Sequence, residues 1–383
     1  MMIHDANSTD IFLLLLRSGL YGTPIPEDHM PERIDWKAVV ALAKKHFVLG
    51  TIIEAVPMLP EELRPSATTV ARMSKFAIGL IQTNIIMDKT AAHLVATLRQ
   101  HGIEGVLLKG QGIARIYPKP QMRQSGDIDF YVGKRIYKKA CDICRQYLVE
   151  DKSTCAETFQ HFDFTLSGVT IELHRIASRI YSPVRNRRFQ RWIISHLENS
   201  TSTRSLNIDG TEIHLPSLDF DAIFIFYHAW RHFIMGGIGM RQLCDWAMIF
   251  HAHADEIDTP RLIDNIHSFG MTTGWKLFAC IAVHHLGIPQ DKMPLYDPTF
   301  TAKSEKVLQD IIDGGNFGHF SKANTRVNTH GSTLAYALGK ARNVTEYFFS
   351  LFPLLPVEAT FLYASRLYEG AIACFKRSKS TPK

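Results

Sequence analysis

The stretch from Val106 to Val132, VLLKGQGIARIYPKPQMRQSGDIDFYV, constrains this chain more than any other. Its second half is a strand that begins Asp127-Ile128-Asp129. Because successive side chains of a β-strand point to opposite faces, Asp127 and Asp129 are expected on one face and Ile128 on the other. Two such carboxylates lie about 6–7 Å apart at Cα, and could flank two Mg²⁺ ions roughly 3.5–4 Å apart. The strand therefore predicts a magnesium site.

A third acidic ligand is expected on a neighbouring strand. In the segment VTIELH, residues 169–174, alternation places Glu172 and His174 on the face opposite the apolar residues, so Glu172 is the favoured third ligand. Asp163, in the preceding run HFDF, alternates in the same way and remains the alternative. His174 either lines the same pocket or faces solvent.

The Lys-Gly-Gln-Gly turn before the acidic strand has the pattern of a phosphate-binding turn. It follows an apolar strand and opens a helix, whose N-terminus offers unpaired backbone N–H groups and a positive dipole end. Glycine permits close approach of a phosphate, and the lysine adds a cation. The candidate phosphate-binding residues are Lys109, Gly110, Gln111 and Gly112.

Three regions differ in their hydrophobic pattern. Residues 1–100 are expected to be helical, with helices at Asp10–Leu20, Trp36–Ala55 and about 66–99, the last long enough to connect into the next domain. Residues 101–216 are expected to form a small mixed sheet, with hairpins turning at Ser167-Gly168 and Asp209-Gly210. Residues 217–375 are predicted to be helical again, and 376–383 to be a disordered basic tail. The predicted class is α+β.

The C-terminal region is expected to contain helices after an N-cap at Ser217, at Met240–Ala252, and at 260–270, 273–286, 302–313, 333–350 and 357–375, with a polar loop over 314–332. On the first of these, His228 and His232 are spaced i, i+4 and suit either a structural role or a metal. Arg241 and Asp245 have the same spacing and predict a helix salt bridge.

Composition excludes several classes of protein. No window has about twenty uninterrupted apolar residues, so no membrane span is predicted. Six scattered cysteines do not form a disulfide framework, and the short apolar run near the N-terminus lacks a positive flank, so a cytoplasmic location is expected. Cys141 and Cys144 form a C-x-x-C without a second half, which predicts two cysteines on one helix. A net charge of +6 is mild for this length and suits an anionic small substrate as well as a nucleic acid, so the charge alone does not decide between them.

These motifs together resemble a known family. The segments LLKG, Tyr117-Pro118, Arg123-x-x-Gly126-Asp-Ile-Asp and Ile171-Glu-Leu-His174, with a later His-bearing helix, are similar to the uncharacterised bacterial nucleotidyltransferase family of the DNA polymerase beta-like nucleotidyltransferase superfamily. The resemblance covers about residues 70–300. It implies a nucleotidyltransferase domain flanked by helical regions, and metal-dependent transfer of a nucleoside monophosphate from an NTP to a hydroxyl acceptor, with release of pyrophosphate.

The resemblance also implies roles for individual residues. Asp127 and Asp129 would hold two Mg²⁺ ions, and Glu172 would hold the ion beside the attacking hydroxyl. Lys109 and the turn from Gly110 to Gly112 would bind the triphosphate, and Arg123 would stabilise the negative charge that develops on the phosphates. At Gln111 the superfamily usually has Ser or Gly, so the Ser contact is missing here.

Two rival functions stay open at this point. One is a catalytically silent member that binds nucleotide or a partner protein, for which Gln111 is the only hint. The other is a polymerase or tRNA-tailing enzyme, which the modest charge and the lack of a basic and aromatic patch disfavour. The sequence indicates neither the acceptor, nor the base of the NTP, nor the oligomeric state.

Overall fold

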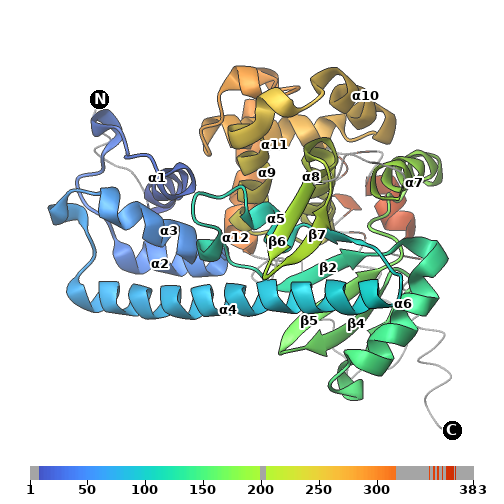
Figure 1. The fold of residues 1–383 in the computed structure, drawn as a ribbon. Coiled ribbons are helices and arrows are strands. Elements are labelled where there is room, and N and C mark those ends of the chain that lie inside the picture. The colour runs from blue at the N-terminus through green and yellow to red at the C-terminus, as the bar shows by residue number, and fades with distance from the viewer. Residues whose placement is uncertain are drawn as a thin grey trace, which may run out of the picture.

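The computed structural model describes residues 8–198 and 204–315, together with isolated positions between 345 and 367. It has the predicted α+β architecture: along the chain, helical regions precede and follow the segment that forms the mixed sheet. Figure 1 shows the N-terminal helices at one end, the strands toward the other end, and most of the later helices above the strands. The polar loop expected at 314–332, the helices expected at 333–350 and 357–375, and the tail 376–383 lie largely or wholly outside the described residues.

The N-terminal region contains three short helices, α1 (Ser8–Tyr21), α2 (Trp36–Lys45) and α3 (Leu49–Ala55). The prediction of one continuous helix from Trp36 to Ala55 was wrong. Phe47 adopts a left-handed backbone with φ of 57°, which ends the run of right-handed helical residues. The chain therefore turns between α2 and α3, and both helices pack beside α1.

Helix α4 (Ala67–Gln100) is the longest element and confirms the expected helix at 66–99. The Ser66 hydroxyl caps it by accepting a hydrogen bond from the Thr69 N–H. In Figure 1 the helix runs beneath the N-terminal helices and then across the strands. Met73, near its start, belongs to the N-terminal core, whereas Leu94 and Leu98 belong to the core of the sheet. The helix thus joins the two regions, as its length predicted.

The main sheet has five strands in the order β1-β2-β5-β4-β3. Strands β2 and β5 are parallel and the other neighbours are antiparallel, so the sheet is mixed as expected. The strands are β1 (Val106–Leu108), β2 (Asp127–Tyr131), β3 (Ala156–Glu157), β4 (His161–Leu166) and β5 (Val169–His174). Short helix α5 (Gly110–Ala114) and the turn η4 (Pro120–Met122) connect β1 to β2, and α6 (Gly133–Tyr147) follows β2.

The two predicted hairpins both form. Ser167-Gly168 joins β4 to β5, and Asp209-Gly210 joins β6 (Arg204–Ile208) to β7 (Thr211–Leu215) in a separate two-stranded sheet. Helix α7 (Pro183–Leu197), which lies between the hairpins, was not predicted from the sequence. Its apolar residues Phe189, Trp192, Ile193 and Leu197 recur at helical spacing and are buried.

The C-terminal region consists of packed helices. Ser217 caps the first by accepting a hydrogen bond from Phe220 N–H, and Gly236 and Gly237, both with positive φ, end it. The described helices are α8 (Leu218–Met235), α9 (Met240–His253), α10 (Thr259–Phe269), α11 (Thr272–His284) and α12 (Thr301–Gly314). They confirm the helices expected up to residue 313.

Two hydrophobic cores hold the chain together. One is shared by the N-terminal helices and by α8–α12, so residues far apart in sequence pack in a single cluster. The other joins one face of the main sheet, through Ile128, Phe130, Ile171 and Leu173, to α4 and α6. On the opposite face, Val106 and Leu108 of β1 and Tyr131 of β2 pack into the first core, and the polar side chains of β2, β5 and β4 lie beside them. None of the described helices is both long and apolar enough to cross a membrane.

Candidate active site

The acidic strand presents its carboxylates away from the core. On β2, Ile128 and Phe130 are fully buried in the core of the sheet, so Asp127 and Asp129 share the opposite face. The register of the parallel pair places Asp129 directly beside Glu172 of β5. Asp127, Asp129 and Glu172 all line one cavity of about 460 Å³. The structure thus brings together the three carboxylates that strand parity selected.

Asp163, the alternative third ligand, lies one strand farther away. It is the cross-strand partner of Glu172 on β4, and it does not line the cavity. Its side chain lies 3.5 Å from the Nε2 atom of His161. Glu172 is therefore the carboxylate next to the Asp pair.

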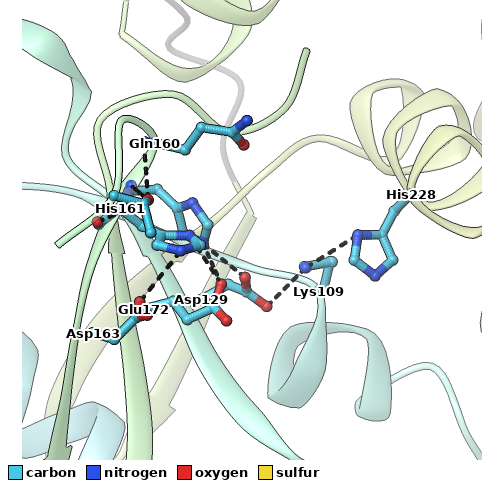
Figure 2. A network of polar contacts seen from close by, with 9 residues as sticks. Lys109, Asp129, Gln160, His161, Asp163, Glu172 and His228 are labelled. Carbon is cyan, nitrogen blue, oxygen red and sulfur yellow. Dashed lines mark hydrogen bonds and ion pairs between the residues drawn. The ribbon is translucent and has the colours of Figure 1, made fainter. Parts of the chain in front are cut away.

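Lys109 links the acidic strand to the C-terminal helices. Its Nζ atom lies 2.9 Å from Asp129 Oδ2 and donates a hydrogen bond to Nδ1 of His228, 3.3 Å away on α8. Figure 2 shows the side chain extended between these two partners. The ammonium can therefore neutralise the buried Asp129 while remaining at the cavity wall, where an anionic ligand would meet it.

The turn after β1 is only partly directed at the cavity. Lys109 and Gly110 both have positive φ, 52° and 38°, and both line the cavity. The Gln111 side chain instead donates to Asp88 Oδ1 and accepts from the Ser125 hydroxyl, both at 2.7 Å. A Cβ at Gly112 would lie 2.9 Å from the Leu215 side chain, so this glycine permits close packing. Gln111 and Gly112, predicted as phosphate binders, support the turn and do not line the cavity.

Asp127 and Asp129 differ in their surroundings. Burial raises the pKa of Asp129, but Lys109 and the hydrogen bond from His174 outweigh burial, and the net pKa lies far below its ordinary value. The pKa of Asp127 is raised, first by repulsion from Asp129 and then by burial. Among the described residues, Asp127 makes no hydrogen bond or ion pair, so it is the carboxylate with free ligand capacity.

Two histidines flank Glu172. Nε2 of His174 donates to Asp129 Oδ1 at 2.8 Å and lies 3.2 Å from Glu172 Oε2. Nδ1 of His161 lies 3.3 Å from the same Glu172 oxygen (Figure 2). Burial lowers the pKa of His174, but its hydrogen bonds to Asp129 and Glu172 outweigh burial and raise it to about 9. His174 is buried and lines the cavity, which decides between the two placements that the sequence left open.

Helices α8 and α9 form the opposite wall of the cavity. His228 and His232, predicted to share a helix face, both line it with Arg231 and Arg241. Burial and the nearby Lys109 lower the pKa of His228 well below its ordinary value and that of His232 to about 4. Both imidazoles are neutral near pH 7 as a result. Neither arginine makes an ion pair with a described residue, so both remain available to an anion.

Arg123 lines the cavity and has a partner within the chain. It is buried and forms a bidentate ion pair with Asp245 of α9, with both N–O distances 2.7 Å. Tyr117 also donates to Asp245, at 2.8 Å. The predicted helix salt bridge between Arg241 and Asp245 was therefore wrong, because Asp245 is used by Arg123. Arg241 donates instead to the Gln124 carbonyl, 2.9 Å away.

The match to a known protein family shows to which family the chain belongs. Residues 32–287 match the profile of the uncharacterised nucleotidyltransferase family. The chain belongs to this family. The match begins before α2 and ends after α11, so it includes the acidic strand, the Lys109 turn and both walls of the cavity. The family resemblance of the motifs is confirmed.

Other comparisons add little to the family assignment. One solved structure, that of an antigenic nucleotidyltransferase-like protein from Paracoccidioides brasiliensis, matches 47% of this chain and 92% of its own chain at 12% identity. Its TM-score of 0.28 is too low to carry a structural argument. A search of curated proteins gave no match.

This nucleotidyltransferase family member has cavity residues that the sequence reading did not single out. One of them is His161, whose place beside His174 could have been predicted from the register of the hairpin. The two-residue turn Ser167-Gly168 pairs Leu166 with Val169, and counting back along both strands pairs His161 with His174. Arg231 and Arg241 carried no such signal, because only the packing of α8 and α9 over the sheet brings them to the cavity.

The C-x-x-C motif lies apart from the cavity. Cys141 and Cys144 are buried on one face of α6, as expected for two cysteines on a helix. Burial raises the pKa of Cys141 to about 11 and that of Cys144 to about 12. Both thiols are therefore protonated and inert near neutral pH.

Proposed function

We propose that this family member transfers a nucleoside monophosphate from an NTP to a hydroxyl acceptor and releases pyrophosphate. The observation that carries the proposal is the set of three carboxylates, Asp127, Asp129 and Glu172, on two adjacent strands in register, all facing one cavity whose opposite wall is cationic. Carboxylate oxygens are ligands of divalent metal ions, and cationic side chains form charge-assisted hydrogen bonds with the phosphates of an NTP.

The carboxylates fit a divalent cation such as Mg²⁺. Asp127 is largely enclosed, repelled by Asp129, and makes no hydrogen bond or ion pair with a described residue. A cation beside these two carboxylates would relieve the repulsion, and Glu172 adds a third oxygen donor from the next strand. Mg²⁺ accepts such oxygen ligands and keeps positions for water and substrate phosphates. When bound, it would neutralise charge that develops on the transferred phosphoryl group.

The protein side chains have separate tasks in this proposal. Arg231 and Arg241 bind the phosphates of the NTP from the wall opposite the carboxylates, and Lys109 binds them from its place beside Asp129. Glu172, which is partly exposed to the cavity, accepts the proton of the acceptor hydroxyl. Arg123, already neutralised by Asp245, acts as a positioning residue that fixes α9 against the strand carrying the Asp pair.

The decisive experiment removes the acidic pair. The double variant Asp127→Asn/Asp129→Asn is expected to lose metal-dependent pyrophosphate release and the transfer of label from an NTP labelled at the α-phosphate, in the presence of Mg²⁺ and a cell extract that supplies acceptors. The reason is the loss of two anionic ligands without a change in side-chain size. Release should fall by a factor of at least about 100, the order lost when a main charge-stabilising group is removed.

A matched control is Asp142→Asn, an exposed aspartate on α6, which should retain wild-type turnover. Unchanged pyrophosphate release in the double variant would overturn the proposal. Binding of an NTP with and without Mg²⁺ separates catalysis from silent binding: a silent member binds the NTP but yields no product with any acceptor in the extract.

A further inference from the structure

The cavity face of the sheet carries more ligand groups than nucleotidyl transfer uses. Three adjacent strands each contribute a pair of polar residues at i and i+2: Asp127 and Asp129 on β2, Glu172 and His174 on β5, and His161 and Asp163 on β4. The register places His161 opposite His174, and Asp163 opposite Glu172. The two histidines of this array have no role in the proposed transfer, which uses the neighbouring Glu172.

The distances within this part match a metal-binding set. Glu172 Oε2 lies 3.3 Å from His161 Nδ1 and 3.2 Å from His174 Nε2, and one ligand atom from each residue lies within 4.8 Å of the others. A tetrahedral Zn²⁺ ion with bonds of about 2.0–2.1 Å separates its ligand atoms by about 3.3 Å. The two distances to Glu172 are thus close to the spacing that such an ion requires. On binding, Nε2 of His174 would release the proton that it now donates to Asp129 and take the ion in its place.

The same residues have unsatisfied polar atoms. Nδ1 of His161 and Nδ1 of His174 are buried and make no hydrogen bond with a described residue, although Nδ1 of His161 lies within ion-pair distance of Glu172. A buried polar atom without a partner costs roughly 1–3 kcal/mol. A cation beside Glu172 would give Nδ1 of His161 the partner that it lacks.

We propose that His161, Glu172 and His174 form a binding site for one transition-metal ion of the Zn²⁺ type, beside the carboxylate site and sharing Glu172 with it. Two imidazoles and one carboxylate are a known zinc ligand set that leaves the fourth position open. Mg²⁺ prefers oxygen ligands, whereas imidazole suits Zn²⁺ and similar ions, so the two neighbouring sites select different metals. The open fourth position faces the cavity, where it could receive water or an oxygen of the acceptor.

The test uses Co²⁺ as a spectroscopic probe of the full-length protein, in millimolar Mg²⁺. One Co²⁺ ion per chain is expected to bind, to give visible absorption bands of a four- or five-coordinate ion, and to be displaced by Zn²⁺. His161→Ala and His174→Ala should each weaken Co²⁺ binding by more than about 100-fold, since loss of an outer-shell partner alone costs 10–100-fold. Circular dichroism checks that each variant is folded. His161→Gln, whose side chain is close in size to histidine, removes the imidazole without leaving a large cavity and is expected to weaken Co²⁺ binding in the same way.

Controls address the other metal-binding groups of the chain. His214→Ala removes a histidine of β7 outside the cavity, and Cys141→Ser disrupts the C-x-x-C of α6; both should bind Co²⁺ like the wild type. Equal affinity in His161→Ala and wild-type protein, or no binding to folded wild-type protein, would overturn the proposal. The single variant Asp127→Asn, whose carboxylate contacts neither histidine, should retain Co²⁺ while losing transfer. A failure of the metal-site proposal can therefore be told apart from a failure of the proposed transfer.

Discussion

At the scale of single residues, the buried ion pair of Arg123 and Asp245 joins the acidic strand to α9. Both side chains are at least nine-tenths buried, and Tyr117 adds a hydrogen bond to the same carboxylate. Asp245→Asn would leave the guanidinium buried without its counter-charge. We expect the free energy of unfolding in urea to fall by about 3–5 kcal/mol.

The control for this variant is Asp264→Asn, an exposed aspartate on α10, whose effect should stay within about 0.5 kcal/mol. Similar losses of stability in both variants would show that the Arg123 pair does not stabilise the fold. The pair also explains why a basic residue near the acidic motif is a weak predictor of phosphate binding: its partner is 122 residues away in the chain.

His46 gives the stability of the protein a dependence on pH. It is fully buried, and burial together with Lys45 lowers its pKa to about 4 from an ordinary 6.5. Between pH 4 and pH 6.5 the unfolded chain binds a proton at His46 that the folded chain does not bind. The contribution of neutral His46 to the free energy of unfolding is therefore present above pH 6.5 and is lost as the pH falls to about 4. The full loss amounts to about 3 kcal/mol.

The measurement compares wild-type protein with His46→Gln, which cannot be protonated. Urea unfolding at several values between pH 7 and pH 4 should give a smaller decrease of the free energy of unfolding for the variant. Parallel curves for the two proteins would contradict the prediction, because the remaining histidines are common to both.

At the scale of elements, two glycines on neighbouring helices are expected to respond oppositely to the same substitution. A Cβ on Gly50 of α3 would lie 1.9 Å from the Met122 carbonyl, whereas a Cβ on Gly79 of α4 would meet nothing within 4 Å. Gly79→Ala should stabilise the protein by roughly 0.5–1 kcal/mol through helix propensity. Gly50→Ala should destabilise it, because α3 must move away from η4.

Urea unfolding of the two alanine variants checks the sign of each effect, and each serves as the control for the other. Changes of the same sign would show that the close approach of α3 to η4 does not limit the packing there.

The elements themselves were predicted where the pattern was regular. The strands at 127–131, 161–166 and 169–174 alternate strictly, and α4 and the helices up to residue 314 repeat at helical spacing. The break at Phe47 was missed because neither proline nor glycine marks it; it depends on a single residue with positive φ. Helix α7 was not predicted although its buried residues recur at helical spacing, because Arg185, Arg187 and Arg188 precede them and make the first half of the helix polar.

At the scale of the whole molecule, the cavity exists only because the sheet and the C-terminal helices pack together. Arg231 of α8 and Arg241 of α9 line it without an ion-pair partner among the described residues. If they bind the phosphates of an NTP, Arg231→Gln and Arg241→Gln should each weaken the binding of a non-hydrolysable triphosphate analogue by roughly tenfold, or about 1.4 kcal/mol.

Equilibrium titration in Mg²⁺ gives the dissociation constants. Arg188→Gln, an exposed position on α7, is the control with the same change of net charge and should bind like the wild type. Affinity reduced equally in all three variants would point to net charge alone, and unchanged affinity in the first two would remove both arginines from the nucleotide site.

Local sequence determined the class of fold, most elements and the three carboxylates, because strand alternation and helical periodicity are properties of neighbouring residues. Tertiary structure alone decided which charges are free. It paired Arg123 with Asp245, turned Gln111 toward Asp88, brought Lys109 to Asp129, and placed Arg231 and Arg241 over the sheet. The physical reason is that an ion pair depends on distance in space, and these partners come from elements that only the packed cores bring together.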